Sequence, residues 1–170
     1  MATESAPPTD VNLSSILEGL CDAGVEFVLV GGLAAVVQGA PVTTMDVDIV
    51  HHQSPENIAR LLTFLKSIQA IHRRPDDKAI EASSKDLSGK VHALYATRLG
   101  ALDVLAVIEQ GYAYPELVEH AVEIEFRGHV LRVLDLKTMI RLKKTSSDMK
   151  DKRRLPVLEE TLRQLEDKQG

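Results

Sequence analysis

Residues 26–50 constrain the fold of this chain more than any other stretch. Residues 27–30 form a short apolar run, rich in valine, of the kind typical of a buried strand. Gly31 and Gly32 follow, and residues 33–38 contain no helix breaker. A helix that begins at Gly32 has free backbone N–H groups beside the two glycines, and such a helix end favours a phosphate group. Because glycine has no Cβ, ligand and backbone can approach closely there.

Two acidic residues follow at alternate positions, in the run Asp46-Val47-Asp48-Ile49. Residues two apart in a strand point to one face, so both carboxylates face one side and the apolar residues face the core. Two neighbouring carboxylates repel each other unless a cation lies between them. Oxygen ligands suit Mg²⁺ or Mn²⁺, and magnesium usually accompanies phosphate. The stretch therefore predicts a metal-dependent nucleotide site.

A third acid, Asp103, lies within the second of two predicted strands, residues 91–96 and 101–106, which a turn at residues 98–100 connects. A buried carboxylate is costly unless it is paired or binds a metal ion. Asp103 could instead form an ion pair with Arg98 or cap a local turn. We favour metal binding, because an acid in an otherwise apolar strand usually has a function or a partner.

Together these residues resemble the signature of the nucleotidyltransferase superfamily, which includes DNA polymerase β and the minimal nucleotidyltransferases. That signature has a hydrophobic residue, Gly-Gly or Gly-Ser, a spacer, Asp-x-Asp, and a further acid on a later strand. Within the superfamily, the chain is similar to small bacterial proteins of the toxin–antitoxin type, the AbiEii-like group. Many of these carry an Arg shortly before the Thr, where this chain has Val42. The positions that fit the group's pattern are Gly31, Gly32, Ala34, Gly39, Thr44, Asp46 and Asp48.

The resemblance implies an α/β (α+β) fold of the polymerase β palm type, with a short mixed sheet flanked by helices and a C-terminal helical extension. We expect one domain over residues 11–170, with the C-terminal helices in 134–170, after a disordered tail of residues 1–10. The implied activity is Mg²⁺- or Mn²⁺-dependent transfer of a nucleoside monophosphate from an NTP to a hydroxyl group. The acceptor would be an RNA 3′ end, such as that of a tRNA, or a protein side chain.

The resemblance also assigns roles to residues. The expected catalytic residues and metal ligands are Asp46, Asp48 and Asp103. The expected nucleotide contacts are Gly31, Gly32, Thr44, Lys143 and Lys150. A toxin–antitoxin role, a partner protein from the same operon and a homodimer are compatible with the resemblance, although no residue specifies them.

The segment 143–154 concentrates positive charge in an otherwise acidic chain. The similar proteins have a helix ending in Lys, a short loop and Lys-Asp opening the last helix, which Lys143, Lys150 and Asp151 match. The implied role is to bind the triphosphate or to position the last helix. An ordinary solvated basic face explains the segment equally well.

Capping residues, apolar spacing and turn residues predict the remaining elements. His51 and His52 are interpreted as solvated strand-end residues, since neighbours on a strand point to opposite faces. Residues 73–90 are predicted to be a loop. The other expected elements are helices from Asp10 or Asn12 to Ala23, from the Ser54 cap to Ala70 and over 77–83, a hairpin over 121–134 that turns at Arg127-Gly128, a helix capped by Asp135, and a last helix over 148–167 containing Pro156.

Composition narrows the class of protein. A chain of 170 residues with 44% hydrophobic and 4% aromatic residues can build one aliphatic core. The net charge of −5 argues against a polycation that binds nucleic acid, and one Cys allows no internal disulfide. The sequence has no membrane span and no signal peptide, so we expect a cytoplasmic protein.

Two other interpretations were weighed. A nucleotidyltransferase-like binding or regulatory module that has lost catalysis stays open, because a fold does not dictate function. A dinucleotide-binding protein is disfavoured, because the Gly-x-Gly-x-x-Gly spacing is absent and the acids occur as a pair.

Overall fold

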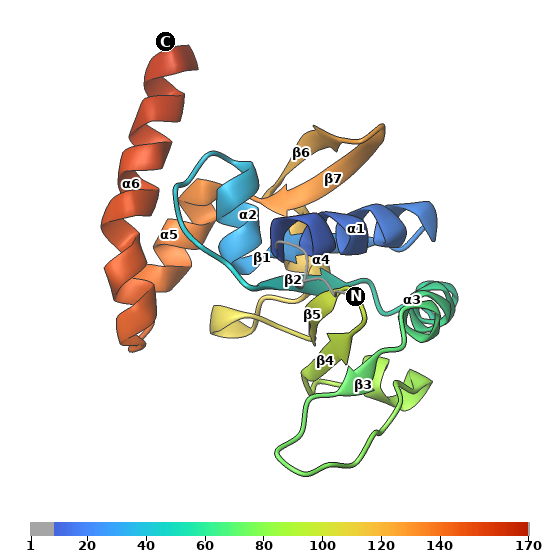
Figure 1. The fold of residues 1–170 in the computed structure, drawn as a ribbon. Coiled ribbons are helices and arrows are strands. Elements are labelled where there is room, and N and C mark those ends of the chain that lie inside the picture. Colours follow the sequence, from blue (N-terminus) through green and yellow to red (C-terminus); the bar gives the residue numbers. More distant parts are fainter. Residues whose placement is uncertain (1–8, 170) are drawn as a thin grey trace, which may run out of the picture.

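The computed structural model describes residues 9–169, with side chains from Leu13 onwards. Seven strands form one mixed sheet in the order β3-β4-β5-β2-β1-β7-β6, with helices around it and a long helix at the C-terminus (Figure 1). This is the α/β architecture that the sequence predicts. The strands are β1 (Phe27–Val30), β2 (Asp46–His51), β3 (Ile71–His72), β4 (Ala93–Thr97), β5 (Gly100–Leu105), β6 (Ala121–Phe126) and β7 (His129–Leu134).

The helices surround this sheet. Two 3₁₀ turns, Ser84–Leu87 and Glu109–Gly111, lie in the loops before β4 and after β5. In Figure 1, α5 and α6 lie together, away from α1 and α3. The α-helices are α1 (Thr9–Asp22), α2 (Gly31–Val37), α3 (Pro55–Ser67), α4 (Tyr114–Val118), α5 (Leu136–Lys144) and α6 (Met149–Gln169).

Strand β2 lies in the middle of the sheet and fixes the register of the site. It pairs antiparallel with β1, where Val30 lies opposite Asp48, and parallel with β5, where Asp48 lies opposite Asp103. Residues directly opposite each other on neighbouring strands share a face of the sheet. The acids on β2 and β5 are therefore brought side by side by strand pairing alone.

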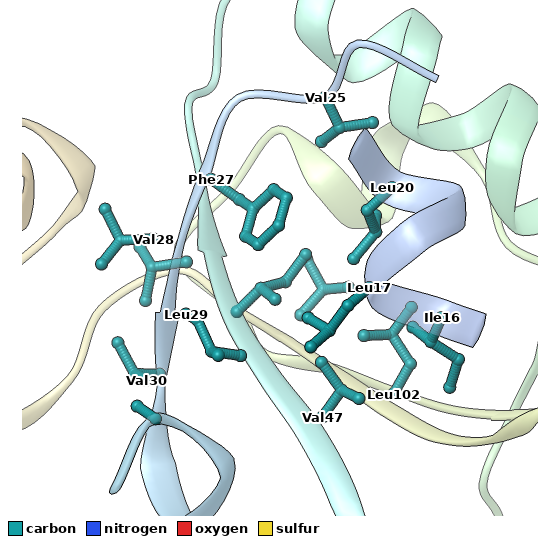
Figure 2. Close-up of a cluster of buried hydrophobic side chains, with 14 of the residues drawn as sticks. Ile16, Leu17, Leu20, Val25, Phe27, Val28, Leu29, Val30, Val47 and Leu102 are labelled. Atoms are coloured by element: carbon teal, nitrogen blue, oxygen red, sulfur yellow. The ribbon is translucent and has the colours of Figure 1, made fainter. Parts of the chain in front are cut away.

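One face of the sheet packs against α1. Phe27 and Leu29 point toward Leu17 and Leu20 of that helix, whereas Val28 and Val30 point to the other side of β1 (Figure 2). Alternation along β2 gives the same division, since Val47 and Ile49 are fully buried while Asp46 and Asp48 are partly exposed. The apolar core is thus separated from the acids by the pleat of the strand.

Several local predictions are confirmed by their hydrogen bonds. The Ser54 hydroxyl accepts from the Asn57 amide at 3.2 Å at the start of α3, and the Asp135 carboxylate accepts from the Thr138 amide at 2.7 Å at the start of α5. The β6–β7 hairpin turns at Arg127 and Gly128, both with positive φ. These elements were predictable because the residues that define them are adjacent in sequence.

Other predictions are wrong. Residues 77–83 form no helix; the one turn of helix in this loop is the 3₁₀ turn Ser84–Leu87. The short strand β3 was not anticipated, because two residues carry no periodic pattern. The disordered tail was predicted over residues 1–10, but α1 already begins at Thr9. Residues 1–8 lie outside the described residues.

His51 also differs from its prediction, because it is buried rather than solvated, with 3% of its surface exposed. Its Nε2 lies 2.8 Å from the carbonyl oxygen of Leu87, in the 3₁₀ turn that follows β3. Burial lowers the pKa of His51, and the neighbouring His52 lowers it further, so the ring is neutral. The histidine therefore anchors the loop before β4 to the end of β2.

Candidate active site

Three carboxylates lie together on the face of the sheet opposite α1. Asp46 and Asp48 come from β2 and Asp103 from the neighbouring β5, and one oxygen from each lies within 4.8 Å of the others. Oδ1 of Asp48 is buried and has no hydrogen-bond partner among the described residues. A buried acceptor without a partner is costly, so the Asp48 carboxylate is suited to bind a cation or a hydrogen-bond donor.

The protonation of these acids reflects the same crowding. Burial, followed by the charges of Asp46 and Asp103, raises the pKa of Asp48 to about 8. Burial and Asp103 also raise the pKa of Asp46, against the opposing charges of Arg73 and Lys150. Three neighbouring carboxylate oxygens are the donor set that Mg²⁺ and Mn²⁺ prefer, so the cluster fits the metal ion implied by the sequence.

Arg73, which follows β3, supplies positive charge beside the third acid. Its Nη1 forms an ion pair with Oδ1 of Asp103 at 2.7 Å and also donates to the carbonyl oxygen of Tyr95 at 3.0 Å. The sequence had suggested Arg98 as the alternative partner of Asp103, and Arg73 takes that position instead.

The two glycines allow the acids and a basic side chain to approach the start of α2. Gly31 has a φ of +75°, and a methyl group there would overlap the Asp48 carboxylate. A Cβ on Gly32 would lie 2.9 Å from Nη1 of Arg154 and 3.0 Å from the Thr44 side chain. Gly31 thus requires glycine for space and for backbone conformation, whereas a side chain at Gly32 would require Arg154 and Thr44 to shift.

A polar cavity of about 350 Å³ opens beside these glycines. It brings together the start of α2, the loop before β2, the acids of β2 and the facing ends of α5 and α6. Asp103 is the one predicted site residue that does not line it. The predicted residues that do are Gly31, Gly32, Thr44, Asp46, Asp48, Lys143 and Lys150.

Lys143 does not lie free in this cavity. Its Nζ is 2.9 Å from Oδ1 of Asp151, and the Ser146 hydroxyl donates to the other oxygen of Asp151 at 2.8 Å. Although burial opposes the change, these hydrogen bonds lower the pKa of Asp151 and keep it ionised. Of the two roles implied for this segment, positioning of the last helix is the one that these contacts support directly.

Arg154 is a basic residue of the cavity that sequence reasoning did not single out. Its Nη2 donates to the carbonyl oxygen of Thr43 at 2.8 Å, so it reaches from α6 to the loop before β2. Lys150 and Arg154 are four residues apart in one helix and therefore lie on the same side of it. That spacing was the available signal, since a helix that presents Lys150 to the cavity must present Arg154 as well.

A second, apolar cavity of about 180 Å³ adjoins the first. The two share Gly31, Asp48, Lys143 and Asp151 along their linings, so the acids lie between a charged compartment and an apolar one. Glu109, in the 3₁₀ turn after β5, also lines the second cavity. Its apolar lining residues are Val30, Leu105, Ile108, Leu134, Met139 and Leu142.

Solved structures with a similar fold are nucleotidyltransferases. The lincosamide antibiotic adenylyltransferase LnuA, with lincomycin bound, superposes with a TM-score of 0.57 at 14% identity over 88% of this chain and 96% of its own. ANT(2")-Ia in complex with adenylyl-2"-tobramycin gives 0.56 at 14% identity over 91% and 90%. A candidate nucleotidyltransferase from Thermotoga maritima gives 0.51 at 17% identity over 97% of each chain.

At this identity the similarity establishes the fold, and it confirms the resemblance to the nucleotidyltransferase superfamily at that level. No protein-family model matches the sequence, and a search of curated proteins finds no match. Within residues 9–169, no helix is long and apolar enough to cross a membrane.

Proposed function

We propose that this chain is a metal-dependent nucleotidyltransferase that transfers a nucleoside monophosphate from an NTP to a hydroxyl group. The observation that carries the proposal is the cluster of Asp46, Asp48 and Asp103, with a buried oxygen that has no partner among the described residues, beside a glycine-lined polar cavity that Lys150 and Arg154 also line. The nucleotidyltransferase fold supports the same conclusion. Acids and basic residues in this order match what a metal-bound triphosphate requires.

Each group of residues has a role in the proposed reaction. Asp46, Asp48 and Asp103 would hold Mg²⁺ or Mn²⁺, which supplies neutralisation of the phosphate charge when bound. The backbone at Gly31 and Gly32, the Thr44 hydroxyl and Lys150 would bind the phosphates in the polar cavity, together with Arg154. Lys143 holds α6 in position through Asp151 and presents its remaining N–H groups to the same cavity.

The attacking hydroxyl would approach from the side of β5. Asp103 lies outside both cavities, next to Arg73, so an acceptor beside it would not compete with the triphosphate for space. The Asp103 carboxylate could then accept the proton of the attacking hydroxyl. In this arrangement the chain contributes position and charge, which are the main sources of catalysis in phosphoryl transfer.

Three classes of acceptor are proposed. Two come from the resemblance to toxin–antitoxin nucleotidyltransferases: an RNA 3′ end, such as that of a tRNA, and a protein side-chain hydroxyl. The third is a small hydroxylated molecule, because the structural neighbours are crystallised with lincomycin and with an adenylylated tobramycin. For the RNA and protein acceptors we also propose a cytoplasmic location, a partner protein encoded in the same operon and a homodimer.

One observation favours a second candidate, a nucleotide-binding module without catalysis. Arg73 already places a cation 2.7 Å from Asp103, which reduces the need for a metal ion at the third acid. In that case the protein would bind a nucleotide through the polar cavity and transfer nothing.

Label transfer distinguishes the two candidates. The purified protein is incubated with Mg²⁺ or Mn²⁺ and each α-labelled NTP, with total RNA, cell extract or an aminoglycoside and lincosamide mixture as acceptor. Label that appears on one acceptor and is lost in Asp46→Asn supports the enzyme and names its acceptor class. Metal-dependent NTP binding without label on any acceptor supports the binding module, and no NTP binding at all contradicts both.

A further inference from the structure

The apolar cavity beside Asp48 is too small for a whole nucleotide. Its volume of about 180 Å³ lies below the roughly 300–1,000 Å³ of pockets that enclose drug-sized ligands, so it admits one ring system. It is lined by residues at the ends of β1, β5 and β7, by Ile108 after β5 and by Met139 and Leu142 of α5. A flat ring between aliphatic walls buries both of its faces.

The walls of this cavity are held together by contacts between the turn after β5 and α5. The guanidinium of Arg141 donates to the Tyr112 hydroxyl at 3.2 Å and lies 5.7 Å from the centre of the Tyr112 ring. Gln110 Nε2 also donates to the Thr145 hydroxyl at 3.4 Å. The cavity is therefore a preformed slot and not a gap that a ligand must open.

The position of the slot indicates which part of a substrate it would hold. It meets the polar cavity along Gly31, Asp48 and Lys143, so a nucleotide with its triphosphate in the polar cavity passes these residues before entering the slot. Asp103 and Arg73, where the acceptor approaches, line neither cavity. The ring that enters the slot is thus the base of the nucleotide and not part of the acceptor.

Glu109 gives the slot its one polar side chain that is not shared with the polar cavity. Within residues 9–169 the Glu109 carboxylate has no hydrogen-bond or ion-pair partner. A carboxylate accepts hydrogen bonds only, so opposite the exocyclic position of a base it favours an amino group over a carbonyl oxygen. The exocyclic amino groups of adenine, cytosine and guanine are such donors.

We infer that this slot binds the base of the NTP and that Glu109 selects bases with an exocyclic amino group over uracil, an inference that rests on the proposed function. Uracil has a carbonyl oxygen where cytosine has its amino group, and two acceptors facing each other repel. Cytosine is therefore favoured for two reasons. Its amino group gains a hydrogen bond to the Glu109 carboxylate, and the uracil carbonyl oxygen at the same position would be left unpaired.

The test compares two pairs of nucleotides that differ at this position, CTP with UTP and ATP with ITP. Binding is measured by calorimetry with Ca²⁺ in place of Mg²⁺ to slow turnover, on the wild-type chain, Glu109→Gln and Glu125→Gln. Glu125 is an exposed acid of β6 outside both cavities, so Glu125→Gln removes the same charge as Glu109→Gln without changing the slot. A glutamine side chain has nearly the size of glutamate but can donate as well as accept hydrogen bonds. Glu109→Gln can therefore pair with either an amino group or a carbonyl oxygen of the base.

In each pair that binds, the wild type should favour the amino-bearing nucleotide by about five- to tenfold, the effect of one charge-assisted hydrogen bond at a partly exposed group. Glu109→Gln should bring the two members within about twofold, and Glu125→Gln should keep the wild-type ratio. Equal affinities in the wild type, or a ratio that Glu109→Gln leaves unchanged, would overturn the inference while the proposed function stands. A failure to bind any of the four nucleotides would overturn the proposed function and this inference together.

Discussion

The two faces of β2 carry opposite kinds of residues and do opposite work. Toward α1, Val47 (Figure 2) and Ile49 are fully buried in the apolar core and stabilise the fold. Toward the cavities, Asp46 and Asp48 lie beside Asp103, and an oxygen of Asp48 is buried without a partner among the described residues. One strand therefore carries a face that stabilises the fold through apolar burial and a face whose neighbouring carboxylates raise the pKa values of Asp46 and Asp48.

Removal of one acid is the strongest test of the difference between the two faces of β2. Asp46→Asn should lower nucleotidyl transfer by about 10²–10³-fold or more, because charge stabilisation at the reacting phosphate is lost. The free energy of unfolding should not fall, since the substitution also removes a repelling charge. Label transfer and urea denaturation of the same preparation check both statements, with Glu125→Gln as a control at an exposed acid. Full activity in Asp46→Asn would exclude it from the reaction.

The opposite result is expected on the other face. Leu29→Ala removes a fully buried side chain between β1 and α1 and should lower the free energy of unfolding by about 2–5 kcal/mol. Nucleotide affinity per folded molecule should change little, because Leu29 points away from the acids. Urea denaturation and calorimetry measure the two quantities. A loss of affinity without a loss of stability would show that the faces are not separate.

Gly31 joins the two regions, since it directly follows β1 as the first residue of α2 and lies beside Asp48. Gly31→Ala should cost roughly 1–2 kcal/mol for the positive φ alone, and the added methyl group must also displace the Asp48 carboxylate. We expect lower stability and weaker metal binding in one variant. Gly128→Ala is the control, because it shares the positive φ but has open space around the position of its Cβ. If the control also loses metal binding, the effect at Gly31 is not local.

The pH dependence of stability should distinguish the faces as well. The folded pKa of Asp48, about 8, lies above its unfolded value near 3.9, so the folded metal-free protein holds a proton that the unfolded chain releases. Its stability should therefore fall as pH rises from about 4 to 8, and Asp48→Asn should remove roughly 1–3 kcal/mol of that fall. Urea denaturation with EDTA at pH 5.5, 7 and 8.5 measures it. If the free energy of unfolding changed with pH equally in the wild type and in Asp48→Asn, the raised pKa of Asp48 would be contradicted.

The smallest effect is expected at the edge of the polar cavity. Arg154→Ala should weaken NTP binding about tenfold while leaving binding of the corresponding NMP nearly unchanged, if its guanidinium contacts the outer phosphates. Arg153→Ala is the matched control, because Arg153 is exposed and lies outside both cavities. An equal loss for NTP and NMP would mean that Arg154 only fixes the loop at Thr43.

The part of the site that sequence reasoning found is the part encoded locally. Gly31, Gly32, Asp46 and Asp48 lie within a short stretch, and strand alternation fixes the direction of both acids. Asp103 was identifiable from a different signal, a charge inside an apolar strand. The caps of α3 and α5 were predictable because neighbouring residues define them, whereas the mixed sheet was expected from the resemblance to the nucleotidyltransferase superfamily.

The residues that were missed depend on tertiary structure. Arg73 reaches Asp103 only because β3 pairs at the edge of β4, and the pairing of two residues leaves no pattern in the sequence. Arg154 meets Gly32 because the Lys143–Asp151 pair ties α5 to α6. His51 is buried because a loop more than thirty residues later supplies the Leu87 carbonyl. Spacing could indicate Arg154, which lies four residues after Lys150, but not its neighbour Gly32, and it gives no sign of Arg73 or of the burial of His51.

The most direct test is a calorimetric titration of the metal-free protein with Mn²⁺ at pH 7, repeated in buffers of different ionisation enthalpy and with Asp48→Asn. If the three acids form the metal site, Mn²⁺ should bind the wild type and release close to one proton, because Asp48 is mostly protonated at that pH, and Asp48→Asn should abolish the binding. If Mn²⁺ does not bind with or without an NTP, or binds Asp48→Asn equally well, the acids are not a metal site and the proposed reaction loses its basis.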